Sequence, residues 1–290
     1  MTMNNKEAIQ NLLAFYGILD RPLTALEIYK LIQVETNLTS VVEELETLTR
    51  AGTVTESCGF FSLAKRPLGN EGRRKQDFLL DLKWKKLSCY ARWFRHIPFV
   101  EFALASGSMA LGNVTTFSDF DILTGVRKGR MFTSRYCTLA LFFLLGARRS
   151  NDKKESGLNK LCFNHFVIES IFAKPPYNMY RRELYRNLVP LWGKPEKLEM
   201  FFSENKQLSG LSDVPETRRY IRSKTSAVRR AAEFALSGRF GDWLEKQSAR
   251  IAKRRLARYI KNRPQTGRVV ISDSELEFHF SLPYEAEFEN

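Results

Sequence analysis

The segment from Val100 to Gly125, VEFALASGSMALGNVTTFSDFDILTG, constrains the fold more than any other part of the chain. Residues 100–105 form a short apolar run, which is typical of a buried strand. Gly107 and Ser108 follow at once, and ten residues later the run DFDIL begins. The pattern predicts a strand, a tight turn, a short helical turn, a loop and a second strand.

Two aspartates one residue apart, Asp119 and Asp121, begin the second predicted strand. Side chains alternate along a strand, so the two carboxylates should point the same way while Phe120 and Ile122 face the core. Ionising both carboxylates beside apolar neighbours is costly, and a divalent cation between them removes that cost. Hard oxygen ligands suit Mg²⁺ or Mn²⁺. The alternative is a surface hairpin that carries two solvated aspartates.

The turn before the aspartates has residues suited to phosphate. Gly107 lets the backbone approach a ligand closely. Ser108 offers its N–H and hydroxyl at the start of a helical turn, where anions are favoured. A phosphate-binding turn beside a metal-binding carboxylate pair is an arrangement suited to phosphoryl or nucleotidyl transfer.

The pattern of Gly-Ser, followed by ten residues and then by Asp-apolar-Asp-apolar, resembles the signature of the DNA polymerase β-like nucleotidyltransferase superfamily. The strongest part of this resemblance spans about Phe102 to Leu123. The resemblance implies an α/β (α+β) fold with a small mixed sheet. It implies a Mg²⁺-dependent (or Mn²⁺-dependent) enzyme that transfers NMP from an NTP such as ATP to an acceptor hydroxyl and releases pyrophosphate. Asp119 and Asp121 would hold the metal, and Gly107 and Ser108 the β- and γ-phosphates. The acceptor stays open among a protein, RNA and a small molecule such as an aminoglycoside.

In the superfamily a third carboxylate commonly comes from a nearby strand and acts as general base. Residues 158–172 predict that strand, yet no Asp or Glu lies within it. Asn164 could take the third position as a neutral ligand, and the nearest carboxylates are Glu169 and Asp152. His165 is either a base or a structural histidine. The lack of a carboxylate within this strand motivates an alternative function, that of a catalytically degenerate nucleotide- or RNA-binding regulator on the same fold.

The N-terminal region, residues 1–66, has a pattern of its own. Helices are predicted at 5–17, 25–34 and 41–52, and a two-stranded hairpin turns near Cys58-Gly59. Three helices and a hairpin resemble a winged helix-turn-helix domain, which usually binds DNA through the third helix. Here that helix exposes several glutamates, which phosphates would repel, so we expect protein docking or a structural role and no binding of duplex DNA.

Charge is unevenly distributed. The net charge is +14, and residues 1–60 carry −4, which leaves +18 for the rest. A basic region suits a nucleoside triphosphate or RNA. Arg130 or Arg135, after the second catalytic strand, could clamp triphosphate oxygens. The basic helix within residues 245–263 could track an RNA backbone, or could be the solvated side of a packing helix.

The remaining predictions concern organisation. The nucleotidyltransferase core is assigned to 67–175, and a mainly helical region with terminal strands to 176–290. A polar connector over 65–75 precedes a basic helix from about Gln76 to Arg95. The apolar run from Cys137 to Ala147 predicts a buried helix too short to span a bilayer. No signal-peptide pattern or membrane partner is expected, and four dispersed cysteines favour reduced thiols in a cytoplasmic protein.

Overall fold

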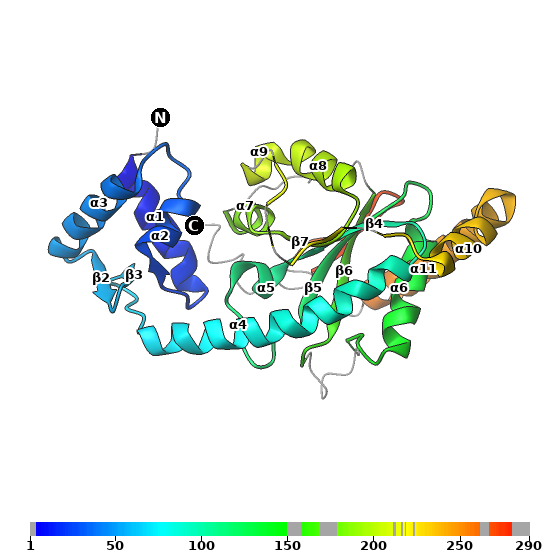
Figure 1. Ribbon diagram of the computed structural model, residues 1–290, viewed down its shortest axis with the longest axis horizontal. Helices are drawn as coiled ribbons and strands as arrows, with labels where there is room; N and C mark the ends of the chain where they lie inside the picture. Colours follow the sequence, from blue (N-terminus) through cyan, green and yellow to red (C-terminus); the bar gives the residue numbers. More distant parts are fainter. Residues whose placement is uncertain are drawn as a thin grey trace. The chain divides into compact units, whose positions relative to one another are not determined.

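The computed structural model describes residues 4–149, 158–168, 179–210, 213–215, 217, 219–222, 224–261 and 267–279. The described chain forms two compact units. The first contains residues 4–81 and 112–115, and the second contains residues 82–111 and those from 116 onward. The chain is mixed α and β, with the larger sheet in the second unit (Figure 1).

The first unit combines helices with a small antiparallel sheet of order β1-β3-β2. Its elements are α1 (Asn5–Ile18), β1 (Leu23–Thr24), α2 (Ala25–Leu31), α3 (Leu38–Arg50), β2 (Val54–Ser57), β3 (Phe60–Leu63) and the first part of α4 (Asn70–Ala91). Cys58 and Gly59 both have positive φ, 51° and 81°, which is the two-residue turn that suits a twisted hairpin.

Local capping sets the helix starts in this unit. Thr24 and Glu27 form a reciprocal capping box at α2, and the Asn37 side chain accepts from the Ser40 N–H at α3. The buried Arg73 guanidinium donates to Glu27 and to the Pro22 carbonyl, which ties the start of α4 into this unit.

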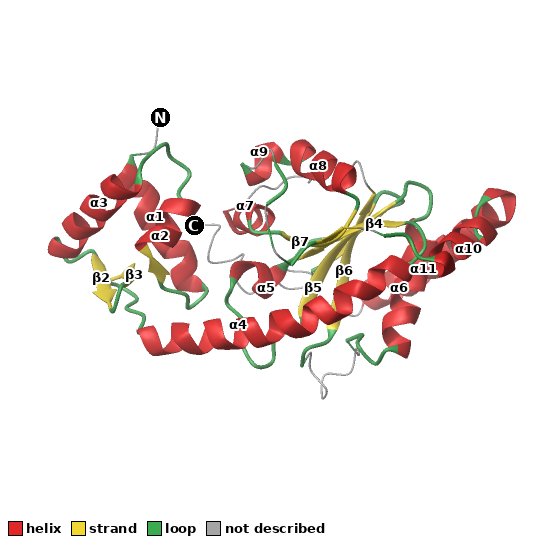
Figure 2. Ribbon diagram, viewed as in Figure 1, coloured by secondary structure: helices red, strands yellow, loops and turns green. Residues whose placement is uncertain are grey.

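The second unit is built on a mixed sheet of order β8-β7-β4-β5-β6-β10-β9. Only β5–β6 and β7–β8 pair in parallel. The strands are β4 (Val100–Ala105), β5 (Phe120–Val126), β6 (Leu161–Ile168), β7 (Val189–Gly193), β8 (Ile221–Arg222), β9 (Val269–Ile271) and β10 (Glu275–Phe278). Helices cover both faces of this sheet (Figure 2).

Aromatic packing joins the helices to the sheet. The helical elements here are the rest of α4, η1 (Arg92–His96), α5 (Gly107–Leu111), α6 (Met131–Leu144), α7 (Met179–Arg186), α8 (Pro195–Glu204), α9 (Lys206–Ser209), α10 (Ala227–Ala235) and α11 (Gly238–Lys261). On one face Phe102 of β4 packs on Phe201 of α8 at a ring-centroid distance of 5.1 Å. On the other, Phe142 of α6 packs on Phe163 of β6, also at 5.1 Å.

Three sequence expectations differ from the structure. The predicted 65–75 connector is shorter, because α4 begins at Asn70, where Arg73 finds its partners in the first unit. The apolar helix is not buried throughout, since Phe143 and Leu144 at the end of α6 are 70% and 81% exposed. The region 176–290, predicted as mainly helical with terminal strands, also contains the strands β7 and β8 before α10.

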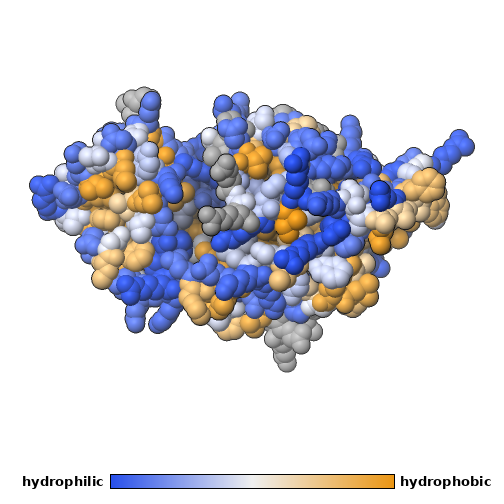
Figure 3. Space-filling view, viewed as in Figure 1, coloured by the Kyte–Doolittle hydropathy of each residue, from blue (hydrophilic) through white to orange (hydrophobic). Residues whose placement is uncertain are grey.

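Apolar side chains also reach the surface at α10 and the start of α11, where Figure 3 shows hydrophobic surface. The most exposed of them is Phe234, at 85%. Among the described residues, no helix has both the length and the apolar character needed to cross a membrane.

Candidate metal centre

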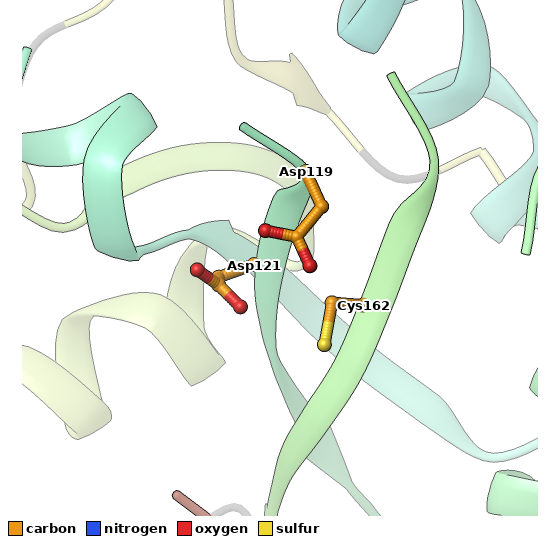
Figure 4. Close-up of side chains that lie close together, drawn as sticks. All are labelled: Asp119, Asp121 and Cys162. Carbon is orange, nitrogen blue, oxygen red and sulfur yellow. The ribbon is translucent and has the colours of Figure 1, made fainter. Parts of the chain in front are cut away.

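The two aspartates converge at the start of β5. Asp119 immediately precedes the strand, Asp121 lies within it, and Phe120 and Ile122 between and after them are fully buried. Cys162 faces them from the neighbouring strand β6 (Figure 4). One ligand atom from each of Asp119, Asp121 and Cys162 lies within 4.8 Å of the other two.

Gly107 lies directly against this carboxylate pair. Its φ is +58°, and a Cβ at this position would lie 2.2 Å from Asp121 Oδ2. Only a residue without a side chain fits there, since both the backbone conformation and the contact exclude one. The neighbouring Ser106 N–H donates to the Asp121 carbonyl at 2.9 Å. The Gly107-Ser108 turn therefore meets the aspartates at one place.

The site disfavours two ionised carboxylates. Burial, and then repulsion by Asp119, raises the pKa of Asp121 from 3.8 to about 6, although His279 and Arg149 offset part of the effect. Burial and the same carboxylates raise the pKa of the Cys162 thiol well above its ordinary value, and its soft sulfur suits Mg²⁺ less well than the carboxylate oxygens do. A hard divalent cation held by the two carboxylates would relieve the repulsion, and the donor set therefore fits Mg²⁺.

Two basic side chains support Asp119. The Arg149 Nη1 donates to Asp119 Oδ2 at 2.5 Å. Lys83 of α4 is buried at 4% exposure. Its Nζ donates to the carbonyls of Thr116 and Ser118 at 3.3 and 2.7 Å and to Asn159 Oδ1 at 3.0 Å, which fixes the loop leading into Asp119.

Strand β6 brings Asn164 to the third side of the site. Asp121 pairs with Cys162 and Leu123 pairs with His165, so β6 advances three positions where β5 advances two, and the register shifts there. Asn164 Nδ2 donates to Asp121 Oδ1 at 2.9 Å. Asn164, rather than a carboxylate, is thus the β6 side chain bonded to Asp121.

The last strand adds groups that the sequence interpretation missed. His279 follows β10, and its Nε2 lies 3.0 Å from Asn164 Nδ2 while its Nδ1 lies 2.9 Å from Glu277 Oε1. Glu275, Glu277 and His279 alternate in the segment ELEFHF, which is the signal that one strand face carries them. A chain of contacts therefore runs from Glu277 through His279 and Asn164 to Asp121.

A second acidic cluster, His165, Glu275 and Glu277, also brings ligand atoms within 4.8 Å of one another. Arg268 pairs with both glutamates, at 2.7 Å for Glu275. Although burial opposes it, hydrogen bonding from His165 and Arg268 lowers the pKa of Glu275 to about 2. Burial lowers the pKa of His165 to about 4. Since arginine already balances these charges, the cluster has the character of a structural ion-pair network.

The other predicted residues lie elsewhere. Arg130 forms an ion pair with Asp242 of α11 at 2.7 Å. Arg135 stacks on the Phe278 ring at 5.5 Å. Glu169 and Asp152, the two carboxylate candidates for the third position, fall outside the described residues.

Comparison with protein-family models, curated proteins and solved structures finds no match to this chain.

Proposed function

We propose that the chain is a Mg²⁺-dependent nucleotidyltransferase of the DNA polymerase β-like kind. It would transfer NMP from an NTP to an acceptor hydroxyl with release of pyrophosphate. The observation that carries the proposal is the convergence of Asp119 and Asp121 beside Gly107, where a side chain would strike Asp121 Oδ2.

The arrangement around the site supports the same fold assignment. Strands β4 and β5 are antiparallel, α5 lies in the connection between them, and β6 adds to β5 in parallel. In the first unit, the helices followed by the β2–β3 hairpin are consistent with a winged helix. The acidic third helix makes a docking or structural role our preferred assignment for that unit.

Each site residue has a role in this proposal. Asp119 and Asp121 would hold Mg²⁺, and Gly107 and Ser108 would receive the triphosphate through backbone N–H groups. When bound, Mg²⁺ neutralises phosphate charge and polarises the reacting phosphoryl group. His279 would hold Asn164 in place beside Asp121, because its Nε2 lies 3.0 Å from Asn164 Nδ2 and Glu277 holds the opposite ring nitrogen.

The test compares the wild-type chain with Asp119→Ala/Asp121→Ala. Each α-³²P-labelled NTP is supplied with Mg²⁺ and pools of RNA, protein or aminoglycoside, and transferred label is measured. We expect transfer by the wild type and none by the double variant. Asp81→Ala/Asp273→Ala, which removes two exposed carboxylates, should leave transfer unchanged. Equal transfer by the Asp119/Asp121 variant would refute the proposal.

A second candidate is a regulator that binds nucleotide or RNA without turnover. The presence of Cys162 and Asn164, neither of them a carboxylate, on β6 beside Asp121 favours it. ATP binding by the wild type, measured by calorimetry, with no transfer to any acceptor pool would support this alternative over the enzyme.

A further inference from the structure

A second site in the same unit is a strongly basic pocket. Its volume is about 680 Å³, which falls within the range of small-ligand pockets. One wall comes from the end of α4 and from η1, and the other from β8 and its flanking residues. Strands β7 and β4 separate β8 from β5 in the sheet, so this pocket is distinct from the aspartate pair.

Among the described residues, the charged side chains that line this pocket are all positive. The lining includes Arg92, Arg95, Arg219, Arg222 and Lys224, and no carboxylate among the described residues that form it. Within the described chain none of these five cations forms an ion pair. By contrast, Arg127, Arg149 and Arg268 of the same unit are each paired with an acid. Like charges gathered without compensation are costly, and a bound polyanion relieves that cost.

Aromatic contacts hold part of the pocket in place. The Arg219 guanidinium lies over the Trp84 ring, 4.5 Å from its centroid. Tyr220 is fixed by its hydroxyl, which donates to the Gly193 carbonyl at 2.9 Å. A stacked guanidinium keeps its N–H edge available for phosphate, and Tyr220 offers a ring face to a base.

We infer that this pocket binds the phosphodiester backbone of single-stranded nucleic acid. All five cationic residues are exposed, whereas a site for a free nucleotide would bury most of its ligand. Cations from two separate segments, together with Tyr220 in the same lining, suit a strand that passes along the opening. The inference is independent of the proposed transfer chemistry, since none of these residues belongs to the aspartate site.

The experiment measures fluorescence anisotropy of a labelled 12-nucleotide RNA with the full chain between 50 and 400 mM KCl. Arg219→Ala/Arg222→Ala removes two phosphate contacts, so the slope of log K against log salt should fall by about 1.4. At 0.1 M salt that corresponds to a loss of about 25-fold in affinity. Arg92→Ala/Arg95→Ala, on the opposite wall, should act similarly and guards against a local folding defect around Trp84.

A matched control removes the same charge elsewhere. Arg74→Ala/Lys75→Ala on the exposed first part of α4 should change affinity by less than threefold. An equal loss of RNA affinity in this control and in both pocket variants would mean that binding is non-specific. Unchanged RNA affinity in the pocket variants would mean that the strand binds elsewhere. Either outcome overturns the inference. Displacement of the RNA by stoichiometric ATP would also overturn it in favour of a free nucleotide. The same RNA and DNA sequence, compared in parallel, separates the two sources of the backbone.

RNA binding and nucleotide transfer, both measured in Asp119→Ala/Asp121→Ala, test the pocket and the proposed enzyme separately. Retained binding with lost transfer supports both proposals. Retained binding with transfer unchanged supports the pocket and refutes the enzyme.

Discussion

Replacement of Asp121 by asparagine should stabilise the metal-free protein at alkaline pH. In the fold the pKa of Asp121 is raised from 3.8 to about 6 by burial and by Asp119. Between these values the folded state binds more protons than the unfolded state, so stability falls as the pH rises and stays low above pH 6. Asparagine cannot ionise, and it keeps an oxygen that can accept from Asn164.

The gain in stability expected for Asp121→Asn follows from the size of the pKa shift of Asp121. Two pKa units correspond to about 3 kcal/mol at most. Asp121 keeps some contact with solvent, so we expect a gain of about 1–2 kcal/mol at pH 8. The gain should be smaller at pH 4, where the folded carboxyl is already protonated. Urea unfolding at the two pH values measures the difference, with the exposed Asp81→Asn as control.

Magnesium should remove most of the difference in stability between the wild type and Asp121→Asn. If 10 mM Mg²⁺ exceeds its dissociation constant about tenfold, the wild type gains about 1.4 kcal/mol, and Asp121→Asn gains little. A variant less stable than the wild type at pH 8 without metal would refute the electrostatic reasoning. Equal stabilisation of both proteins by Mg²⁺ would remove Asp121 from the metal site.

Three further substitutions test the support around the site, each by urea unfolding. Gly107→Ala should cost about 2 kcal/mol and abolish stabilisation by Mg²⁺, because φ is positive and the new Cβ would displace the Asp121 carboxylate; an unchanged Mg²⁺ effect would contradict this. Lys83→Met should cost about 2–4 kcal/mol, since it leaves three oxygen acceptors without their donor; a cost below 1 kcal/mol would show that water replaces the ammonium. Arg268→Met should cost about 3–5 kcal/mol at pH 7, because the buried Glu275 loses its arginine partner and Glu277 keeps only Arg181 among the described arginines, at 3.8 Å; a neutral effect would argue against a structural network.

Signals that act over a few residues predicted much of the fold. The Cys58-Gly59 turn and the β4–turn–β5 pattern both appear where the sequence places them. Each depends on the chemistry of neighbouring residues, namely a turn residue that accepts positive φ or a short apolar run.

Elements that depend on distant partners were harder to predict. Strand β7 contains Pro190 and lies between two helices, and it is a strand because β4 pairs with it. The start of α4 depends on Arg73 reaching Glu27, which local composition does not encode. The register shift in β6 likewise follows from pairing with β5.

The same distinction applies to the candidate site. Asp119 and Asp121 share a short segment, so their spacing alone suggested a joint role. Cys162 and His279 reach them only because β5, β6 and β10 are neighbours in the sheet. A search for the third group confined to residues 158–172 could not include Glu277 or His279, which come from the end of the chain.

The density of basic residues in the sequence is a weaker guide to a binding site than the number of those residues that lack an acid partner in the fold. The sequence offered the basic helix within residues 245–263 either as an RNA surface or as the solvated side of a packing helix, and Lys253 there is paired with Asp273. The pocket cations, such as Arg95 and Arg222, come from two distant segments and have no acid partner within the described chain. At the aspartate pair the imbalance has the opposite sign, since Arg149 pairs with Asp119 but no cationic side chain of the described residues bonds to Asp121. Each site should therefore attract the charge that the fold does not supply: a divalent cation at the carboxylates and a polyanion at the arginines.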